Sequence, residues 1–175
     1  MIDQRASYWY AFVTKPRHEK KADEALKAAG IESYLPLKKT LNKWKDRKKW
    51  VETPLFSCYI FSQIPYVNRY DVIKIPSVVR IVGFHNQPTP VRSEEITAVR
   101  QLLSGDHHLF VHDGPLPGDS VRIKSGPLIG LEGQLVEFRR GRWFVIYIEA
   151  IGKSVLVDMN EHLVEKVETI LFHRL

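Results

Sequence analysis

The 175-residue sequence contains one cysteine, Cys58, and no long apolar run. A single cysteine excludes an internal disulfide and a cysteine-based zinc site. No stretch reaches the roughly 18–20 apolar residues that cross a bilayer, and the N-terminal MIDQRASYWY lacks the apolar segment of a signal peptide. These absences predict a protein of the cytoplasm, a reducing compartment, with no membrane partner.

Motifs of the common enzymes are also missing. The sequence has no glycine-rich dinucleotide or phosphate loop and no serine nucleophile elbow, and its carboxylates are dispersed. His107, His108 and His112 are close in sequence, but their spacing is not that of a metal site. The sequence therefore predicts a protein that is not an enzyme and that uses no metal or cofactor.

Positive charge is concentrated in one segment. The chain has 26 Lys and Arg against 20 Asp and Glu, a formal charge of +6. Residues 38–49, KKTLNKWKDRKK, carry seven bases and one acid and so account for the whole net charge. Bases interleaved with tryptophan suit contact with phosphates and nucleobases, although a solubilising surface is the alternative. We predict an exposed hairpin or loop whose candidate nucleic-acid contacts are Lys43, Trp44, Lys45, Arg47, Lys48 and Lys49, with Trp50 beside them.

The first half of the chain alternates predicted strands and helices. Apolar and β-branched runs predict strands over 8–14, 31–37, 56–62 and 78–82. Helical spacing and end signals predict helices over 16–30 and 93–103, with a short helix over 66–75. This order predicts an α+β fold with helices packed on an antiparallel sheet.

The second half has a different texture. Gly, Asp, His and Pro in residues 104–117 predict a linker, and short β runs follow over 121–124, 134–138, 142–148 and 154–158. About five strands in so short a span predict a small barrel. Gly126, Gly130 and Gly133 fall where a turn bends the backbone into the next strand. The predicted division is a first domain over 1–103, a linker over 104–117, a barrel over 118–168 and a tail over 169–175.

Several strings resemble one family. Residues 118–133, GDSVRIKSGPLIGLEG, resemble a KOW motif, which opens the SH3-like barrel of NusG-type transcription factors. WYAFVTK at 9–15, PLFSCYIF at 54–61 and IPSVV at 75–79 resemble the N-terminal (NGN) domain of the same family, with Ser57 and Cys58 replacing the usual Pro and Gly. Within the family the chain looks most like the specialised antiterminators of the RfaH and UpxY kind.

The resemblance implies a function. NusG-type factors bind the clamp helices of the largest RNA polymerase subunit through an apolar pocket, and they suppress pausing and termination. By position the pocket here would comprise Val13, Tyr34, Pro54, Phe56, Tyr59 and Phe61. Lys15, Arg17, Lys20 and Lys21 would face upstream or non-template DNA, or leader RNA. A monomeric factor for long operons, such as those for surface polysaccharide, is expected.

The second domain of the family binds a ribosomal protein or the termination factor Rho, and in RfaH it folds instead as a helical hairpin over the pocket. The β-prone run 142–148, RWFVIYI, favours a permanent barrel here. Two alternatives stay open: a general NusG-like factor that couples to Rho or the ribosome, and an RNA-binding, ribosome-associated KOW protein. The latter would not need the strings at 9–15 and 54–61.

Overall fold

The computed structural model describes residues 3–43, 48–84, 87–105, 107–138, 141–158 and 163–167. The chain divides into two compact units, Met1–Ile96 and Thr97–Leu175, and the division falls within helix α3 (Ser93–Ser104). None of the helices described is long and apolar enough to cross a membrane.

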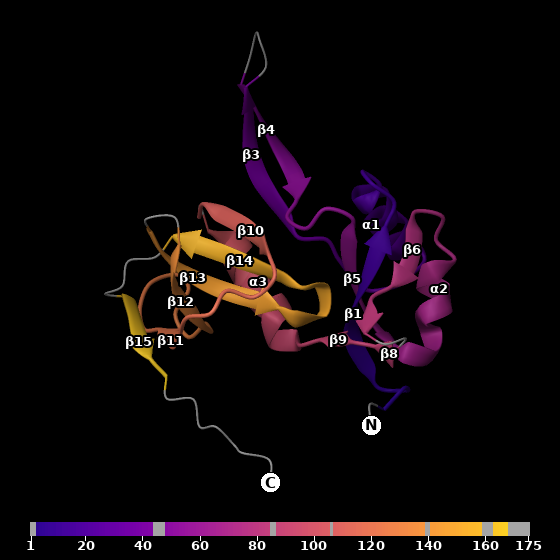
Figure 1. Cartoon of the computed structure of the whole chain (residues 1–175). Coiled ribbons are helices and arrows are strands. Elements are labelled where there is room, and N and C mark those ends of the chain that lie inside the picture. Colours follow the sequence, from indigo (N-terminus) through magenta and orange to yellow (C-terminus); the bar gives the residue numbers. More distant parts are fainter. Residues whose placement is uncertain are drawn as a thin grey trace. The chain divides into compact units, whose positions relative to one another are not determined.

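The first unit is built on an antiparallel sheet around β1 (Ser7–Thr14), whose aromatic and β-branched residues favour a strand. The strand order is β2-β5-β1-β6, and β9 also pairs with β1 (Figure 1). The partner strands are β2 (Ser33–Tyr34), β5 (Tyr59–Pro65), β6 (Val78–Ile81) and β9 (Pro90–Val91).

Two helices contribute to the core of this unit. Helix α1 (Glu19–Ala28) and helix α2 (Arg69–Ile73), which follows the 3-10 turn Tyr66–Asn68, supply Ala22, Leu26 and Val72. These side chains pack with alternate residues of the sheet, and all are buried. The sheet residues are Tyr10, Phe12, Ile60, Ile64 and Val78, with Leu35 beside them.

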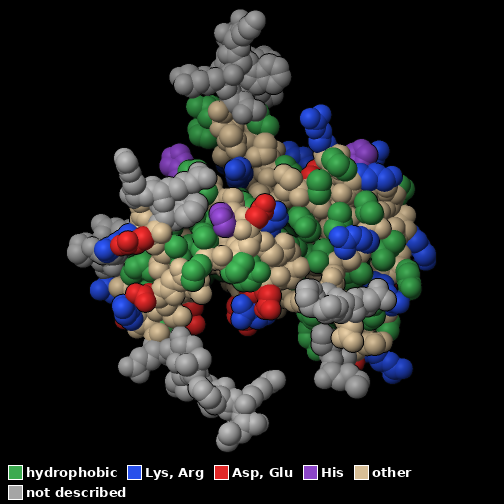
Figure 2. All heavy atoms as spheres, in the orientation of Figure 1, with side chains coloured by type: hydrophobic (Ala, Val, Ile, Leu, Met, Phe, Trp, Pro, Cys, Tyr) green, Lys and Arg blue, Asp and Glu red, His purple; other side chains and the backbone are tan. Residues whose placement is uncertain are grey.

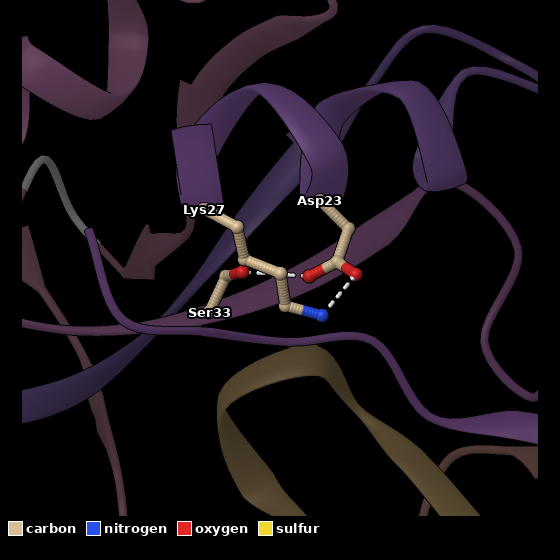
Figure 3. A network of polar contacts seen from close by, with 3 residues as sticks. All are labelled: Asp23, Lys27 and Ser33. Atoms are coloured by element: carbon tan, nitrogen blue, oxygen red, sulfur yellow. Dashed lines mark hydrogen bonds and ion pairs between the residues drawn. The ribbon is translucent and has the colours of Figure 1, made fainter. Parts of the chain in front are cut away.

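A polar network joins α1 to β2 (Figure 3). The Asp23 carboxylate accepts a hydrogen bond from Lys27 Nζ at 2.6 Å and one from Ser33 Oγ at 2.6 Å. The first contact is an exposed i,i+4 pair within the helix and contributes little by itself. The second links helix to sheet and holds β2, the strand that ends at Tyr34, against α1.

The basic segment forms a hairpin, as the sequence predicts. Strand β3 (Leu37–Lys43) pairs with β4 (Lys48–Pro54) from Leu37↔Pro54 to Lys43↔Lys48. The two strands make a sheet of their own and extend away from the five-stranded sheet (Figure 1). A second small hairpin joins β7 (Gly83–Phe84) to β8 (Gln87–Pro88).

The second unit contains a six-stranded antiparallel sheet of order β10-β14-β13-β12-β11-β15. Its core includes Phe144, Ile146, Val155 and Leu156, which are all at most 5% exposed. The strands are β10 (Leu109–Asp113), β11 (Asp119–Ile123), β12 (Glu132–Phe138), β13 (Gly141–Ile148), β14 (Lys153–Asp158) and β15 (Val164–Lys166).

Two predictions about this half differ from the structure. The predicted linker 104–117 contains strand β10, so the described sheet has six strands and not five. Pairing with the distant β14 stabilises this strand, and Ser154 Oγ donates a hydrogen bond to the Gly114 carbonyl at 2.7 Å. The short run LFV at 109–111 is a local signal for this strand, but Gly, Asp and Pro around it favour a linker when the long-range contacts are not known.

A third difference concerns the strand predicted over 56–62. Strand β5 begins only at Tyr59, because Cys58 has a φ of 65°, in the left-handed region, and the preceding residues form a turn. Cys58 therefore does not lie on the face of a strand. Cys58 thus has a conformation that glycine, unlike other residues, adopts without steric cost.

Candidate functional site

One face of the first sheet carries the predicted pocket residues. Residues directly opposite each other in an antiparallel pair share a face, and the register pairs Ala11 with Phe61, Val13 with Tyr59 and Tyr34 with Phe61. The alternate residues of the same strands, including Ile60, belong to the core under α1 and α2. The pocket candidates on these strands therefore lie on the face that points away from the two helices. We call this surface the aromatic face.

The aromatic face is a chain of ring contacts. Tyr34 and Phe61 have ring centroids 6.4 Å apart, and Phe56 meets Phe61 edge-on at 6.0 Å. Trp9 meets Tyr34 edge-on at 6.5 Å and extends the chain. The edge-to-face geometry of two of these pairs is a favourable one for aromatic rings. Trp9 is not among the predicted pocket residues, although it lies two residues from Ala11 and four from Val13 and therefore on the same face.

Burial divides the six candidates into two groups. Phe56 and Phe61 are only 2% and 1% exposed, so their rings act mainly in packing. Val13, Tyr34, Pro54 and Tyr59 are half-buried and keep part of their surface accessible. A partner side chain would meet the second group, supported by the first.

The turn before β5 is fixed from two sides. The Cys58 N–H donates to Glu19 Oε1 at 2.7 Å, and the Cys58 carbonyl accepts the Thr14 N–H at 2.9 Å. Glu19 is 5% exposed, so this contact lies inside the unit. These bonds tie the turn to α1 and β1 and thereby position Phe56 and Tyr59 on either side of Cys58.

A set of exposed bases follows the end of β1. Lys15, Arg17, Lys20 and Lys21 are all exposed, and the Lys15 N–H donates to the Ser77 carbonyl at 2.9 Å. Arg80 on β6 is exposed as well and lies directly opposite Val13, at the border of the aromatic face. Arg80 is not among the predicted contacts, because its place depends on the β1–β6 register. Within the described part of the chain, none of these five bases forms an ion pair with a carboxylate.

The distribution of charge over the first unit agrees with these positions. Figure 2 shows Lys and Arg side chains spread over the face of this unit that is in view, with fewer acidic side chains among them. Such a surface attracts an anionic partner such as a nucleic-acid backbone.

The hairpin candidates are described only in part. Trp44, Lys45 and Arg47 lie outside the described residues, and Lys43, Lys48 and Lys49 are described in their backbone alone. That backbone register sets Lys43 directly opposite Lys48. Trp50 is 63% exposed and is available to a partner.

The three glycines of the second unit have different constraints. Gly126 and Gly130 have φ values of 89° and 85°, which favour glycine strongly. Gly133 has no such φ, but a Cβ there would lie 2.5 Å from the Val145 carbonyl oxygen on β13. The described residues contain no group of three or more His, Cys, Asp or Glu side chains that could hold a metal ion.

Comparison with known proteins identifies the family. The family model described as "Transcription termination factor nusG" matches residues 7–100, more than half of the chain and the part that carries the aromatic face. The chain belongs to the NusG family. It is therefore a transcription factor of the termination and antitermination kind and not an enzyme, which confirms those predictions.

Named relatives and a solved structure agree with this result. The chain is 23% identical over 181 residues to a protein of Borreliella burgdorferi and 26% identical over 179 residues to one of Campylobacter jejuni. Both are named "Transcription termination/antitermination protein NusG"; the matches cover 91% of this chain in each case and 98% and 97% of the two relatives. A structure titled "Domain interaction in Thermotoga maritima NusG" matches with a TM-score of 0.53 and 23% identity over 94% of this chain and 99% of that chain, which shows a shared fold.

Proposed function

We propose that this NusG-family protein binds the clamp helices of the largest RNA polymerase subunit through its aromatic face and keeps the enzyme transcribing through pauses and terminators. The observation that carries the proposal is the convergence of Val13, Tyr34 and Tyr59 on one face, above the buried Phe56 and Phe61. Amphipathic helices bind where apolar and aromatic side chains of this kind line a depression. Pro54 at the end of β4 would border the site.

The exposed bases supply a second contact in the same complex. Lys15, Arg17, Lys20 and Lys21 would face the upstream or non-template DNA strand or the leader RNA, with Arg80 added on structural grounds. Phosphate contacts of this type orient a protein on nucleic acid and make its affinity depend on salt. The protein would thus bridge polymerase and nucleic acid as a monomer.

The second unit would act as a KOW-type barrel that binds a ribosomal protein or Rho. The left-handed Gly126 and Gly130 and the close approach at Gly133 support the tight turn that such a barrel requires. The β-strand content of this unit supports a permanent β fold over a helical one. We propose a domain division in which the first domain stays at 1–103. The second domain comprises 118–168 together with β10, Leu109–Asp113.

Specialised antitermination of long operons, such as those for surface polysaccharide, is the finer form of the proposal. The net charge of the chain resides in one projecting hairpin, which suits contact with the phosphates of a nucleic-acid leader. A general NusG-like role is the second candidate, because the named relatives are NusG proteins. The family match over residues 7–100 disfavours a ribosome-associated KOW protein.

Transcription through an intrinsic terminator tests the proposal. The full-length protein is expected to raise read-through by purified RNA polymerase, and Tyr59→Ala is expected to abolish most of this gain. Tyr70→Ala is the matched control, because Tyr70 is an exposed tyrosine on α2, outside the aromatic face. Equal read-through with and without the wild-type protein, on templates with and without an operon leader, would refute the function. Read-through on every template would favour the general role.

A further inference from the structure

The hairpin has an exposed apolar cross-strand pair on one face. Leu41 on β3 and Trp50 on β4 lie directly opposite each other and are 39% and 63% exposed. Figure 2 shows hydrophobic side chains exposed on the hairpin beside its undescribed tip. An exposed tryptophan on a two-stranded ribbon contributes little to a core and keeps a large aromatic surface accessible to a partner.

A charged pair lies beside this apolar pair. Because side chains alternate along a strand, the pair two residues farther from the tip, Lys39 opposite Glu52, shares its face, and Lys39 is exposed. Lysine and arginine give residues 38–49 a net charge of +6, which attracts an anionic ligand.

We propose that this face of the hairpin binds unpaired nucleic acid, with one base stacked on the Trp50 indole against Leu41 and a flanking phosphate beside Lys39. The combination of a stacking side chain with a basic track is the chemistry of single-strand binding. Duplex DNA offers phosphates but keeps its base faces stacked internally, so the exposed indole would have no partner there. The inference deepens the proposed function, on which it rests for its setting, by naming the strand state and the residue that reads it.

Fluorescence anisotropy of the full chain with labelled oligonucleotides tests the inference. Single-stranded DNA, single-stranded RNA and a DNA duplex of equal length are compared at several salt concentrations. We expect single strands to bind more tightly than duplex, and the tighter of the two single strands to identify the source. Trp50→Ala is expected to weaken single-strand binding roughly five- to a hundredfold, the range for one stacked base. Trp50→Phe, which keeps a ring, is expected to retain most of the affinity.

The salt dependence separates stacking from charge. Trp50→Ala is expected to leave the slope of log affinity against log salt unchanged, because no phosphate contact is lost. Lys39→Gln is expected to make the slope shallower by about 0.7, the value for one phosphate contact on a single strand. Tyr70→Ala removes an exposed ring elsewhere in the same unit and is expected to change neither quantity.

Two results would overturn the inference: duplex binding as tight as single-strand binding, or Trp50→Ala binding single strands like the wild type. If that variant also lost affinity for polymerase, a protein and not a base would cover the indole. These outcomes do not depend on the proposed function, which is tested separately by read-through and by variants of Tyr59. A chain that still raises read-through but does not bind single strands would refute this inference alone.

Discussion

The left-handed turn at Cys58 allows a sharp test of how the candidate site is held. Its φ of 65° is enforced by hydrogen bonds to Glu19 and Thr14 on either side. A residue with a Cβ in this conformation costs about 1–2 kcal/mol, a cost that glycine avoids. Cys58→Gly is therefore expected to relieve strain at the turn that positions Phe56 and Tyr59.

The magnitude follows from a comparison of two variants. Cys58→Ala removes the thiol but keeps the Cβ, whereas Cys58→Gly removes both. Glycine also gains freedom in the unfolded chain, which offsets the relief by about 0.5–1 kcal/mol. We expect the first unit of the glycine variant to be about 1 kcal/mol more stable than that of the alanine variant.

Urea unfolding of the full-length variants measures this difference. The transition of the first unit should shift to higher urea in the glycine variant with an unchanged slope, because the surface exposed on unfolding stays the same. The same comparison at Arg17, whose φ is 64°, provides an independent repeat outside the turn. An alanine variant at position 58 that is at least as stable as the glycine variant would refute the reasoning.

Three further predictions concern single contacts. Glu19→Ala leaves the part-buried Cys58 N–H without its acceptor and is expected to lower the free energy of unfolding by about 1–3 kcal/mol in a urea titration. Glu19→Gln is expected to cost less, and equal losses would contradict this role. Gly133→Ala is expected to destabilise the second unit far more than Gly126→Ala, which costs about 1 kcal/mol, because only the former places a Cβ against β13 backbone; thermal unfolding would show the order. The hydrogen bond from Lys153 lowers the pKa of Asp113. This pair therefore stabilises the second unit at pH values above the usual aspartate pKa, and its contribution is lost as the pH falls through the lowered pKa of Asp113. Asp113→Asn should remove that part of the acid dependence when unfolding is followed from about pH 6 to pH 2, and superimposable profiles would argue against it.

Much of the fold follows from local sequence. The run YWYAFVT is apolar on both alternations and becomes β1, the centre of the first sheet. Ser93 followed by two acids starts α3. The basic segment lies between two apolar, extended runs and forms a hairpin. In each case the signal lies within the element itself.

The missed features depend on distant partners. Strand β10 requires β14, and the turn at Cys58 requires the Glu19 carboxylate. The facing of the pocket residues was also beyond sequence reasoning, because both faces of β1 are buried and neither alternation is polar. Register resolves this ambiguity, and it also brings Arg80 next to Val13.

The measurement that tests the central proposal most directly is binding of the full-length protein to a purified clamp-helix fragment of RNA polymerase. Tyr59 is the residue to change, because it is half-buried on the aromatic face, whereas Phe56 and Phe61 are needed for packing. We predict that the wild type binds, that Tyr59→Ala loses about 1–2 kcal/mol of binding energy, roughly five- to thirtyfold in affinity, and that Tyr70→Ala binds like the wild type. A folded Tyr59→Ala variant that binds as tightly as the wild type would contradict the assignment of the aromatic face.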